Sequence, residues 1–490
     1  MAAECAPFAK RGGLGDVAAA LTRWLVGAGC DARTFLPLYG SIDRERHRLA
    51  RHPEVQGVEV AQGPHRLAFD LWTAPLPLAG DAEAEAGEGA VRPFCFIDCP
   101  QLFAGPEVYL GDDADPPRFA YFCRAVLEAC RRLGWAPQLL HAHDWHAALV
   151  PLYARSLYAG DPEVAAARHL LTLHNVGFQG VTEAARLADL GLAGHAGLFD
   201  PEDLAAGRLN LLKAAIVAAD YITTVSPTHA WEIQTADGGA GLDGLLRQRR
   251  HRLLGIVNGI DVAEWDPATD PHLPAHFTAD DLYGKLACRR TLAEELGFDY
   301  EPAAPTAGIV SRLAWQKGFD LLFEPLPQVL AAGDLRLAVL GTGEASYEGY
   351  FADLERRFPG RVAYRREFSE PLAHRIEAGC DLFLMPSRYE PCGLNQMYSQ
   401  RYGTLPLVRR TGGLADTVEP YAAGGDGSVG TGFVFEHFTA EGFRWALELA
   451  LATWKERAVW ARLMRRAMTR DFSWEKRGGE YLEVYRRLVG

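Results

Sequence analysis

Glu390 stands in a short loop between an apolar run and a helical pattern. The run 380–385 is typical of a buried parallel strand, and a helix is expected to begin near Leu394. Open α/β sheets bind ligands at the carboxyl ends of their strands, and backbone amides would surround a carboxylate placed there. With the glycines of segment 409–416, this pattern indicates a sugar-phosphate site. The alternative is that Glu390 is only a favourable first-turn charge.

A second loop combines a lysine with glycines near the start of the chain. Residues 10–17 have the sequence KRGGLGDV and lead into an expected helix from Ala18 to Val26. Glycines let the backbone approach a ligand closely, and a helix N-terminus favours anions. We therefore predict a phosphate cradle, with a tight turn that serves only packing as the alternative.

Two histidine-bearing segments end expected strands. His141 and His143 alternate onto one face, which raises the possibility of a metal site. Because Asp144 falls in the turn and no complementary Cys or His motif follows, sugar-hydroxyl binding or helix capping by Asp144 is favoured. The next such segment places His174 and Asn175 at a carboxyl edge, where a functional role is favoured over a structural one.

Two cations follow a strand in the second half of the chain. Segment 311–318, with the sequence SRLAWQKG, carries Arg312 and Lys317 on an expected helix start. Two such cations neutralise a diphosphate well, although surface charge is the plain alternative. The turn at 257–261 contains Asn258, whose role spacing alone leaves undecided.

Strand-like runs alternate with amphipathic helical segments, which predicts βαβ order and an α/β fold. The expected strands are 139–142, 169–173, 221–225, 253–257, 306–310, 335–340, 381–385 and 404–408. Hairpin-like segments fill 55–96, and the acidic stretch Gly80–Gly89 is expected to be a solvated loop. We predict an N-terminal domain over 1–247, a second domain over 248–470 that carries the predicted sugar-phosphate site, and a helix over 471–490 that packs back on the first domain.

Composition narrows the classes of partner and compartment. A net charge of −13 argues against nucleic acid or anionic membrane as the main partner, and no run approaches a transmembrane span. Nine scattered cysteines without a secretory signal indicate a reducing, cytoplasmic compartment and no disulfide framework. Because the cysteines show no paired zinc spacing, we expect no metal.

Taken in order, these loops resemble those of bacterial glycogen synthases and plant starch synthases, the glycosyltransferase family 5 enzymes. The matching motifs are KRGGLGDV, HAHDWHA, LTLHN, VNGID, SRLAWQKG, PSRYEPCGLNQMY and YGTLPLVRRTGGLADTV. The resemblance covers nearly the whole chain, and the last two motifs are the most diagnostic. It implies a GT-B fold, in which two Rossmann-like doubly wound domains face a central cleft.

The resemblance also implies an activity: glucose transfer from ADP-glucose to the nonreducing end of an α-1,4-glucan, with retention and without metal or cofactor. In its terms Lys10, Gly12 and Gly13 contact the donor, and Arg312 and Lys317 hold the diphosphate. The remaining implied residues surround the glucose or complete the donor site, with Phe368 stacking on the base: Asp144, His174, Asn258, Phe368, Glu390, Cys392, Gly393, Leu394, Thr411 and Gly412.

Three features depart from the family pattern. Arg11 replaces a Thr or Val beside the donor loop, and Asn395 replaces a Thr or Ser that could cap the helix equally well. The third is the absence of most of a hydrophobic first strand before the Ala-Glu-Cys segment. Of a misassigned start and a truncation, we favour the former, and we expect a version extended upstream to be more stable.

Two other functions remain as alternatives. A phosphorylase-like enzyme of related fold would need a lysine for pyridoxal phosphate, and the chain has only six lysines, two of them in the donor loops. A catalytically impaired glucan-binding or scaffold homologue would need no intact set of site residues, yet Lys10, His174 and Glu390 are all present.

Overall fold

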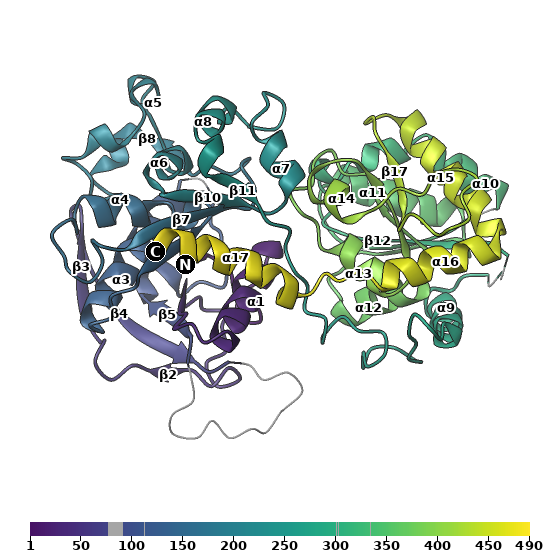
Figure 1. Cartoon of the computed structure of the whole chain (residues 1–490), viewed down its shortest axis with the longest axis horizontal. Coiled ribbons are helices and arrows are strands. Elements are labelled where there is room, and N and C mark those ends of the chain that lie inside the picture. Colours follow the sequence, from purple (N-terminus) through teal and green to yellow (C-terminus); the bar gives the residue numbers. More distant parts are fainter. Residues whose placement is uncertain (77–91, 112, 300, 302, 334) are drawn as a thin grey trace. The chain divides into compact units, whose positions relative to one another are not determined.

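The computed structural model describes residues 1–76, 92–111, 113–299, 301, 303–333 and 335–490, and the stretch expected to be an acidic loop, Gly80–Gly89, lies outside them. These residues form two compact units (Figure 1). Unit 1 comprises Met1–Val225, Ala230–Gly259 and Trp474–Gly490, and unit 2 comprises Ser226–His229 and Ile260–Ser473.

Unit 1 contains two larger sheets and a small ribbon. The first sheet has the order β1-β5-β4-β2 with β3 paired to β4, and the second is fully parallel with the order β11-β10-β7-β6. The strands are β1 (Thr34–Pro37), β2 (Ala50–Arg51), β3 (Val58–Gln62), β4 (His65–Ala74), β5 (Phe94–Asp98), β6 (Leu139–His143), β7 (Arg168–Leu173), β10 (Tyr221–Thr224) and β11 (Leu253–Gly255), with β8 (Val181–Glu183) and β9 (Arg208–Asn210) forming the ribbon.

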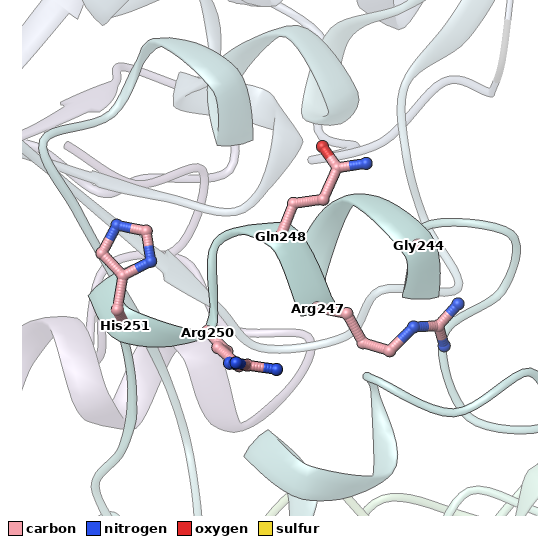
Figure 2. Close-up of a pocket in the computed structure, with 5 residues that line it drawn as sticks. All are labelled: Gly244, Arg247, Gln248, Arg250 and His251. Atoms are coloured by element: carbon pink, nitrogen blue, oxygen red, sulfur yellow. The ribbon is translucent and has the colours of Figure 1, made fainter.

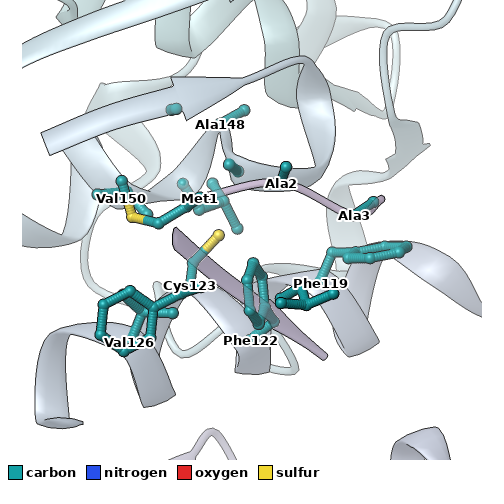
Figure 3. Packing of buried hydrophobic residues seen from close by; sticks show 14 of the residues in the cluster. Met1, Ala2, Ala3, Phe119, Phe122, Cys123, Val126, Ala148 and Val150 are labelled. Atoms are coloured by element: carbon teal, nitrogen blue, oxygen red, sulfur yellow. The ribbon is translucent and has the colours of Figure 1, made fainter. Parts of the chain in front are cut away.

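The first three residues join the two sheets of unit 1. The Ala2 amide donates to the carbonyl of Phe35 in β1, while the Met1 carbonyl accepts from the amide of His143 in β6. Met1, Ala2 and Ala3 are buried, as Figure 3 shows. These three residues therefore lie between the two sheets, at the place where the strand order reverses. The loops that follow them lie at this topological switch point.

Helix α3 (Asp115–Arg132) covers this junction with an apolar stripe. Phe119, Phe122, Cys123 and Val126 follow the i, i+3, i+4, i+7 spacing of one helical face, and all four are buried (Figure 3). Arg131 and Arg132 in its last turn suit the negative end of the helix dipole.

The carboxyl-terminal helix α17 (Trp474–Val489) belongs to unit 1 and packs against α1 (Gly13–Gly27) (Figure 1). A Cβ atom at Gly478 would lie 2.1 Å from the Trp24 ring, so only glycine permits this approach. The other helices of this part are α2 (Pro100–Phe103), α4 (Leu149–Arg155), α5 (Pro201–Ala205), α6 (Leu211–Ala218), α7 (Pro227–Glu232), which spans the division between the units, and α8 (Asp243–Gln248), with 3₁₀ turns at Trp145–Ala147, Ala184–Leu187, Ala196–Leu198 and Arg250–Arg252.

Unit 2 is built on one parallel sheet with the order β14-β13-β12-β15-β16-β17. Numbered within the unit, this order is 3-2-1-4-5-6, the doubly wound arrangement whose switch point lies between β12 and β15. The strands are β12 (Thr306–Val310), β13 (Arg336–Leu340), β14 (Val362–Arg365), β15 (Leu382–Met385), β16 (Leu405–Arg409) and β17 (Phe433–Phe435).

Side-chain caps fix the starts of two helices in unit 2. Ser369 accepts a hydrogen bond from the Leu372 amide, and Thr439 accepts one from the Gly442 amide. The helices are α9 (Tyr283–Leu296), α10 (Pro325–Ala332), α11 (Ala345–Arg357), α12 (Glu370–Gly379), α13 (Asn395–Arg401), α14 (Gly412–Thr417), α15 (Ala440–Lys455) and α16 (Arg457–Met468), with 3₁₀ turns at Trp315–Lys317 and Phe319–Leu322.

All eight expected parallel strands are present, with ends that differ by at most two residues. The division between the units differs from the sequence-based boundary at 247. Leu253–Gly255 pairs with β10 and completes the sheet of unit 1, so the main passage of the chain into unit 2 follows Gly259. None of the nine cysteines, all within the described residues, forms a disulfide, and no helix in the described residues could span a membrane.

Candidate functional site

The switch point of unit 2 brings together the loops that carry Lys317 and Glu390. The first loop follows β12 and the second follows β15, and these strands are neighbours in the sheet. The Arg388 amide donates to the Gln316 carbonyl at 2.9 Å, so the two loops are tied through their backbones. Residues separated by some seventy positions in the chain thus share one sheet edge.

Glu390 is buried and ion-paired. Its Oε2 atom lies 2.6 Å from Lys317 Nζ and accepts a hydrogen bond of 3.1 Å from Ser387 Oγ. Only 6% of Glu390 is exposed, so the ammonium offsets the charge of a carboxylate that has lost most of its water. The pair presents one cation and one anion at the place where a sugar phosphate was predicted.

The turn after Glu390 presents backbone amides. Gly393 adopts a left-handed φ of +72°, which glycine reaches without steric cost, and the turn leads into α13. Within the described residues the amides of Gly393 and Leu394 donate no hydrogen bond, while Cys392 is buried. Asn395 does not cap the helix, because its Nδ2 donates to the Val310 carbonyl at 2.7 Å.

Two glycines let the loop after β16 pack closely against the backbone of the Glu390 loop. Gly412 has a φ of +42°, and a Cβ atom there would lie 2.0 Å from the Glu390 carbonyl oxygen. The Gly413 amide donates to that same carbonyl at 3.1 Å, and Thr411 is buried beside it. The glycine pair therefore holds the backbone of Glu390 in place.

Arg312 and Phe368 are exposed at the same edge of the unit 2 sheet. Arg312 follows β12, and in the described part of the chain its guanidinium has no hydrogen bond or ion pair. The expected helix after it is only a 3₁₀ turn at Trp315–Lys317. Phe368 follows β14 and is 87% exposed, which leaves its ring available for stacking.

In unit 1 the loop of residues 10–13 already holds a carboxylate of the protein. Glu4, which is 4% exposed, accepts hydrogen bonds from the amides of Arg11 (2.5 Å) and Gly12 (2.8 Å). Lys10 Nζ lies 2.7 Å from Asp16 Oδ1. The Gly12 amide is thus engaged rather than open to phosphate, while the Gly13 amide donates no hydrogen bond within the described residues.

Asp144 joins the ends of β6 and β7. Its Oδ1 accepts from the His174 amide at 2.7 Å and the Asn175 amide at 3.4 Å, so the helix-capping interpretation is wrong. Burial raises the pKa of Asp144 to about 7, although both amide hydrogen bonds act in the opposite direction. Asp144 also has a φ of +55°, a strained conformation typical of functional sites.

His174 is held as a neutral imidazole by its surroundings. Burial lowers the pKa of His174 to about 3, and its Nε2 atom lies 2.9 Å from His143 Nδ1. Burial also holds the pKa of His143 well below its usual value. His141 instead contacts Tyr485 OH and Thr172 Oγ1, so the two histidines of β6 have separate partners.

Asn258 follows β11 and is buried, with 4% of its surface exposed. Among the described residues, its Oδ1 atom has no hydrogen-bond partner. A buried polar atom without a partner costs free energy, so this oxygen is suited to receive a hydroxyl or amine of a ligand.

Cavities in unit 1 lie apart from most of these residues. One of about 560 Å³ is lined by Gly244, Arg247, Gln248, Arg250 and His251 (Figure 2) and includes none of the predicted site residues. Another of about 580 Å³ lies next to Met1, between β1, β6 and α17, and His141 and His143 contribute to its wall.

Comparison with known proteins adds family information to this geometry. Residues 1–248 match the family described as starch synthase catalytic domain, and residues 301–466 match glycosyl transferases group 1. A glycogen synthase of Anaeromyxobacter dehalogenans is 44% identical over 100% of this chain and 98% of its own, and glycogen synthase 2 of Geobacter sulfurreducens is 42% identical over 99% and 97%. The chain belongs to the glycogen and starch synthase family.

Solved structures agree with the assignment of this chain to the glycogen and starch synthase family. The catalytic domain of starch synthase IV from Arabidopsis thaliana, bound to ADP and acarbose, superposes with a TM-score of 0.89 at 35% identity, over 99% of this chain and 98% of that one. Sucrose-phosphate synthase from Thermosynechococcus elongatus, at 17% identity and a TM-score of 0.57, shares the fold alone. The two units therefore form a GT-B fold, and the protein is a glycosyltransferase with the function of a glycogen or starch synthase.

Three residues that position this glycogen and starch synthase site were missed from the sequence. Glu4 binds the loop amides, His143 contacts His174, and Ser387 donates to Glu390. Glu4 precedes the KRGG motif and Ser387 precedes Glu390 by only three positions, so proximity was a usable signal for both. His143 was noted only as a possible metal ligand, because its partner lies on another strand.

Proposed function

We propose that this chain transfers glucose from ADP-glucose to the nonreducing end of an α-1,4-glucan, with retention of anomeric configuration. The observation that carries the proposal is the Lys317–Glu390 pair, which lies at the same sheet edge of unit 2 as Arg312, a cation with no side-chain partner among the described residues. A diphosphate leaving group gains negative charge as its bond to glucose breaks, and fixed cations stabilise that charge. ADP and acarbose in the similar starch synthase IV structure support both a nucleotide and a glucan ligand.

In unit 2, different residues bind different parts of the donor. Arg312 and Lys317 bind the diphosphate, helped by the amides at Gly393 and Leu394, and the exposed Phe368 ring stacks on the base. Glu390 accepts hydrogen bonds from glucose hydroxyls while Lys317 and Ser387 keep its carboxylate oriented. The glycines of the β16 loop and Thr411 hold that geometry.

The residues of unit 1 bind glucose. His174 presents a neutral imidazole to a hydroxyl, with Asp144 fixing its backbone, and Asn258 supplies a buried amide oxygen. Lys10 and the Gly13 amide contribute positive charge from the first loop, whereas Gly12 acts through its bond to Glu4.

The transfer step is a front-face exchange. The bond between glucose C1 and the phosphate oxygen breaks while the acceptor O4 attacks C1 from the same face. The departing phosphate oxygen takes the proton of that hydroxyl, so no protein base is required, and ADP leaves with the released electron pair. A stable covalent adduct on Glu390 in a slowed variant would contradict this step.

The test is glucose incorporation into glycogen with ADP-glucose and UDP-glucose measured side by side. We expect incorporation from ADP-glucose that is lost in Glu390→Ala and kept in the exposed-site control Glu294→Ala. Release of the added glucose by an α-specific exoglucosidase checks retention. Incorporation from UDP-glucose alone contradicts the donor assignment, and silence with both donors contradicts the proposal as a whole.

We further propose that the reaction needs no cofactor and no metal ion, and that the enzyme works in the cytoplasm. The two cations at the unit 2 site support the first point, because they supply the charge that a divalent ion supplies in other glycosyltransferases. Unchanged incorporation after treatment with a chelator is the expected result.

A further inference from the structure

A buried histidine and two exposed glutamates meet in unit 2, and none of the three is among the residues of the transfer site. Ligand atoms of Glu264, Glu370 and His374 all lie within 4.8 Å of one another. Glu370 and His374 are one turn apart at the start of α12, so both side chains lie on the same helix face. Glu264 comes from the segment that follows the passage into unit 2.

The orientation of His374 is set by a buried carboxylate. Asp270 Oδ2 lies 2.8 Å from His374 Nδ1 and accepts a hydrogen bond of 2.6 Å from Tyr402 OH. Trp265 stacks on the His374 ring at a centroid distance of 3.8 Å. These contacts hold the imidazole still and assign its proton to Nδ1, because the carboxylate is the acceptor.

The other nitrogen of His374 is buried without a partner. His374 is 1% exposed, and within the described residues its Nε2 atom has no hydrogen-bond partner. A buried ring nitrogen without a hydrogen-bond partner costs free energy that a ligand at this nitrogen would offset. A buried carboxylate that accepts from one ring nitrogen is the arrangement that orients histidine ligands of metals.

We propose that Glu264, Glu370 and His374 bind a divalent transition-metal ion, with Zn²⁺ as the best fit. One imidazole nitrogen with carboxylate oxygens is a Zn²⁺ donor set, and water would complete the tetrahedron. Ligand atoms of a tetrahedral site at bond lengths of about 2.1 Å are about 3.4 Å apart, so the carboxylates must close by roughly 1 Å. Both glutamates are exposed. A buried imidazole ligand disfavours Ca²⁺ and Mg²⁺, which prefer oxygen.

The bound ion would fasten one segment of unit 2 to α12. Glu264 and Trp265 lie on the segment that covers His374, while Glu370 and His374 belong to the helix. Because the segment and the helix each supply a ligand, the ion would cross-link them. Its role would be to stabilise this part of unit 2, and it would take no part in the transfer reaction.

The test is titration of the full-length, chelator-treated protein with ZnCl₂ by calorimetry, with thermal melting alongside. The Glu264→Gln/Glu370→Gln variant removes two ligands from exposed positions and so leaves the core intact. Glu294→Gln/Glu448→Gln, at two other exposed glutamates of unit 2, changes the charge equally and is the matched control. His374→Gln removes the nitrogen ligand and is checked for folding by circular dichroism.

We expect one Zn²⁺ per chain and a higher melting temperature with Zn²⁺ in the wild type and the control. The Glu264→Gln/Glu370→Gln variant should bind at least tenfold more weakly and show no such rise. Co²⁺ should give visible d–d absorption bands in the wild type that this variant lacks. Absence of a stoichiometric site, or equal affinity in the variant and the wild type, would overturn the proposal. Failure of the transfer reaction would leave the proposal untouched, because binding is measured without substrate.

Discussion

Lys317 Nζ lies 2.6 Å from Glu390 Oε2, and the two side chains come from loops after neighbouring strands of one parallel sheet. The carboxylate is 6% exposed, so it depends on this ammonium and on Ser387 for the interactions that water would otherwise supply. A donor diphosphate bound by Lys317 would share the cation with Glu390. In the proposed reaction, the pair would link donor binding to the orientation of the carboxylate that binds the sugar.

The contribution of the Lys317–Glu390 pair to stability can be separated from its proposed role in transfer. Lys317→Met should destabilise the protein by about 3 kcal/mol, because it leaves a buried carboxylate without its cation. Glu390→Gln/Lys317→Met should recover most of that loss, since neither charge remains. Both variants should have lost glucose transfer. Urea unfolding and incorporation assays measure the two effects, and a double variant no more stable than Lys317→Met would contradict the assignment.

The raised pKa of Asp144 predicts a pH-dependent stability. Between pH 3.8, the usual value, and about 7 the folded protein keeps a proton on Asp144 that the unfolded chain has lost. Unfolding releases that proton, so the free energy of unfolding should fall as pH rises through this range, by at most about 1.4 kcal/mol per pH unit.

Asp144→Asn tests this assignment, because the amide oxygen can still accept from the His174 amide while the titration disappears. The difference in urea midpoint between pH 5 and pH 7 should shrink in Asp144→Asn, and the exposed control Asp280→Asn should keep it. An unchanged slope in Asp144→Asn would show that another group causes the dependence.

Glu4 should control the affinity of the first loop for the donor. Glu4→Ala frees the amides of Arg11 and Gly12 and removes the anchor of that loop, so KM for ADP-glucose should rise more than kcat falls. Glu4→Gln keeps one acceptor oxygen and should lie between the wild type and Glu4→Ala. An unaltered KM in Glu4→Ala would show that loop position does not limit donor binding.

His143 should act on turnover through His174. His143→Phe removes the partner of His174 Nε2, and a displaced imidazole should lower kcat by about 100-fold. His141→Phe is the control on the same strand, since its ring contacts Tyr485 and Thr172 instead. We expect His141→Phe to lower the melting temperature with a smaller effect on kcat. Equal effects of both variants on kcat would contradict a specific role of His143.

Local patterns were sufficient for the strands and for most of the loops after them. Apolar runs such as Thr306–Val310 and Leu139–His143 have the length and composition of buried parallel strands, and glycines or charged residues mark where each one ends. The helix expected at Trp315 is only a 3₁₀ turn, because Gly318 at φ +69° interrupts it. The domain boundary differs from the sequence-based one because β11 pairs with β10 and so belongs to unit 1. The residues of β11 alone do not show which strand it pairs with.

The sequence by itself determined the fold class, the family and the loops that carry the chemistry, because these depend on residue type and short spacing. Only the tertiary structure decided which partners those residues take. Glu4 occupies the Gly12 amide, Asp144 binds the His174 amide, and Lys317 pairs with Glu390. The Glu4 contact is local, but the other two join loops that follow different strands, so they exist only once the sheets have set the strand order. The physical reason is that burial and hydrogen bonding are properties of neighbours in space, and strand order determines those neighbours.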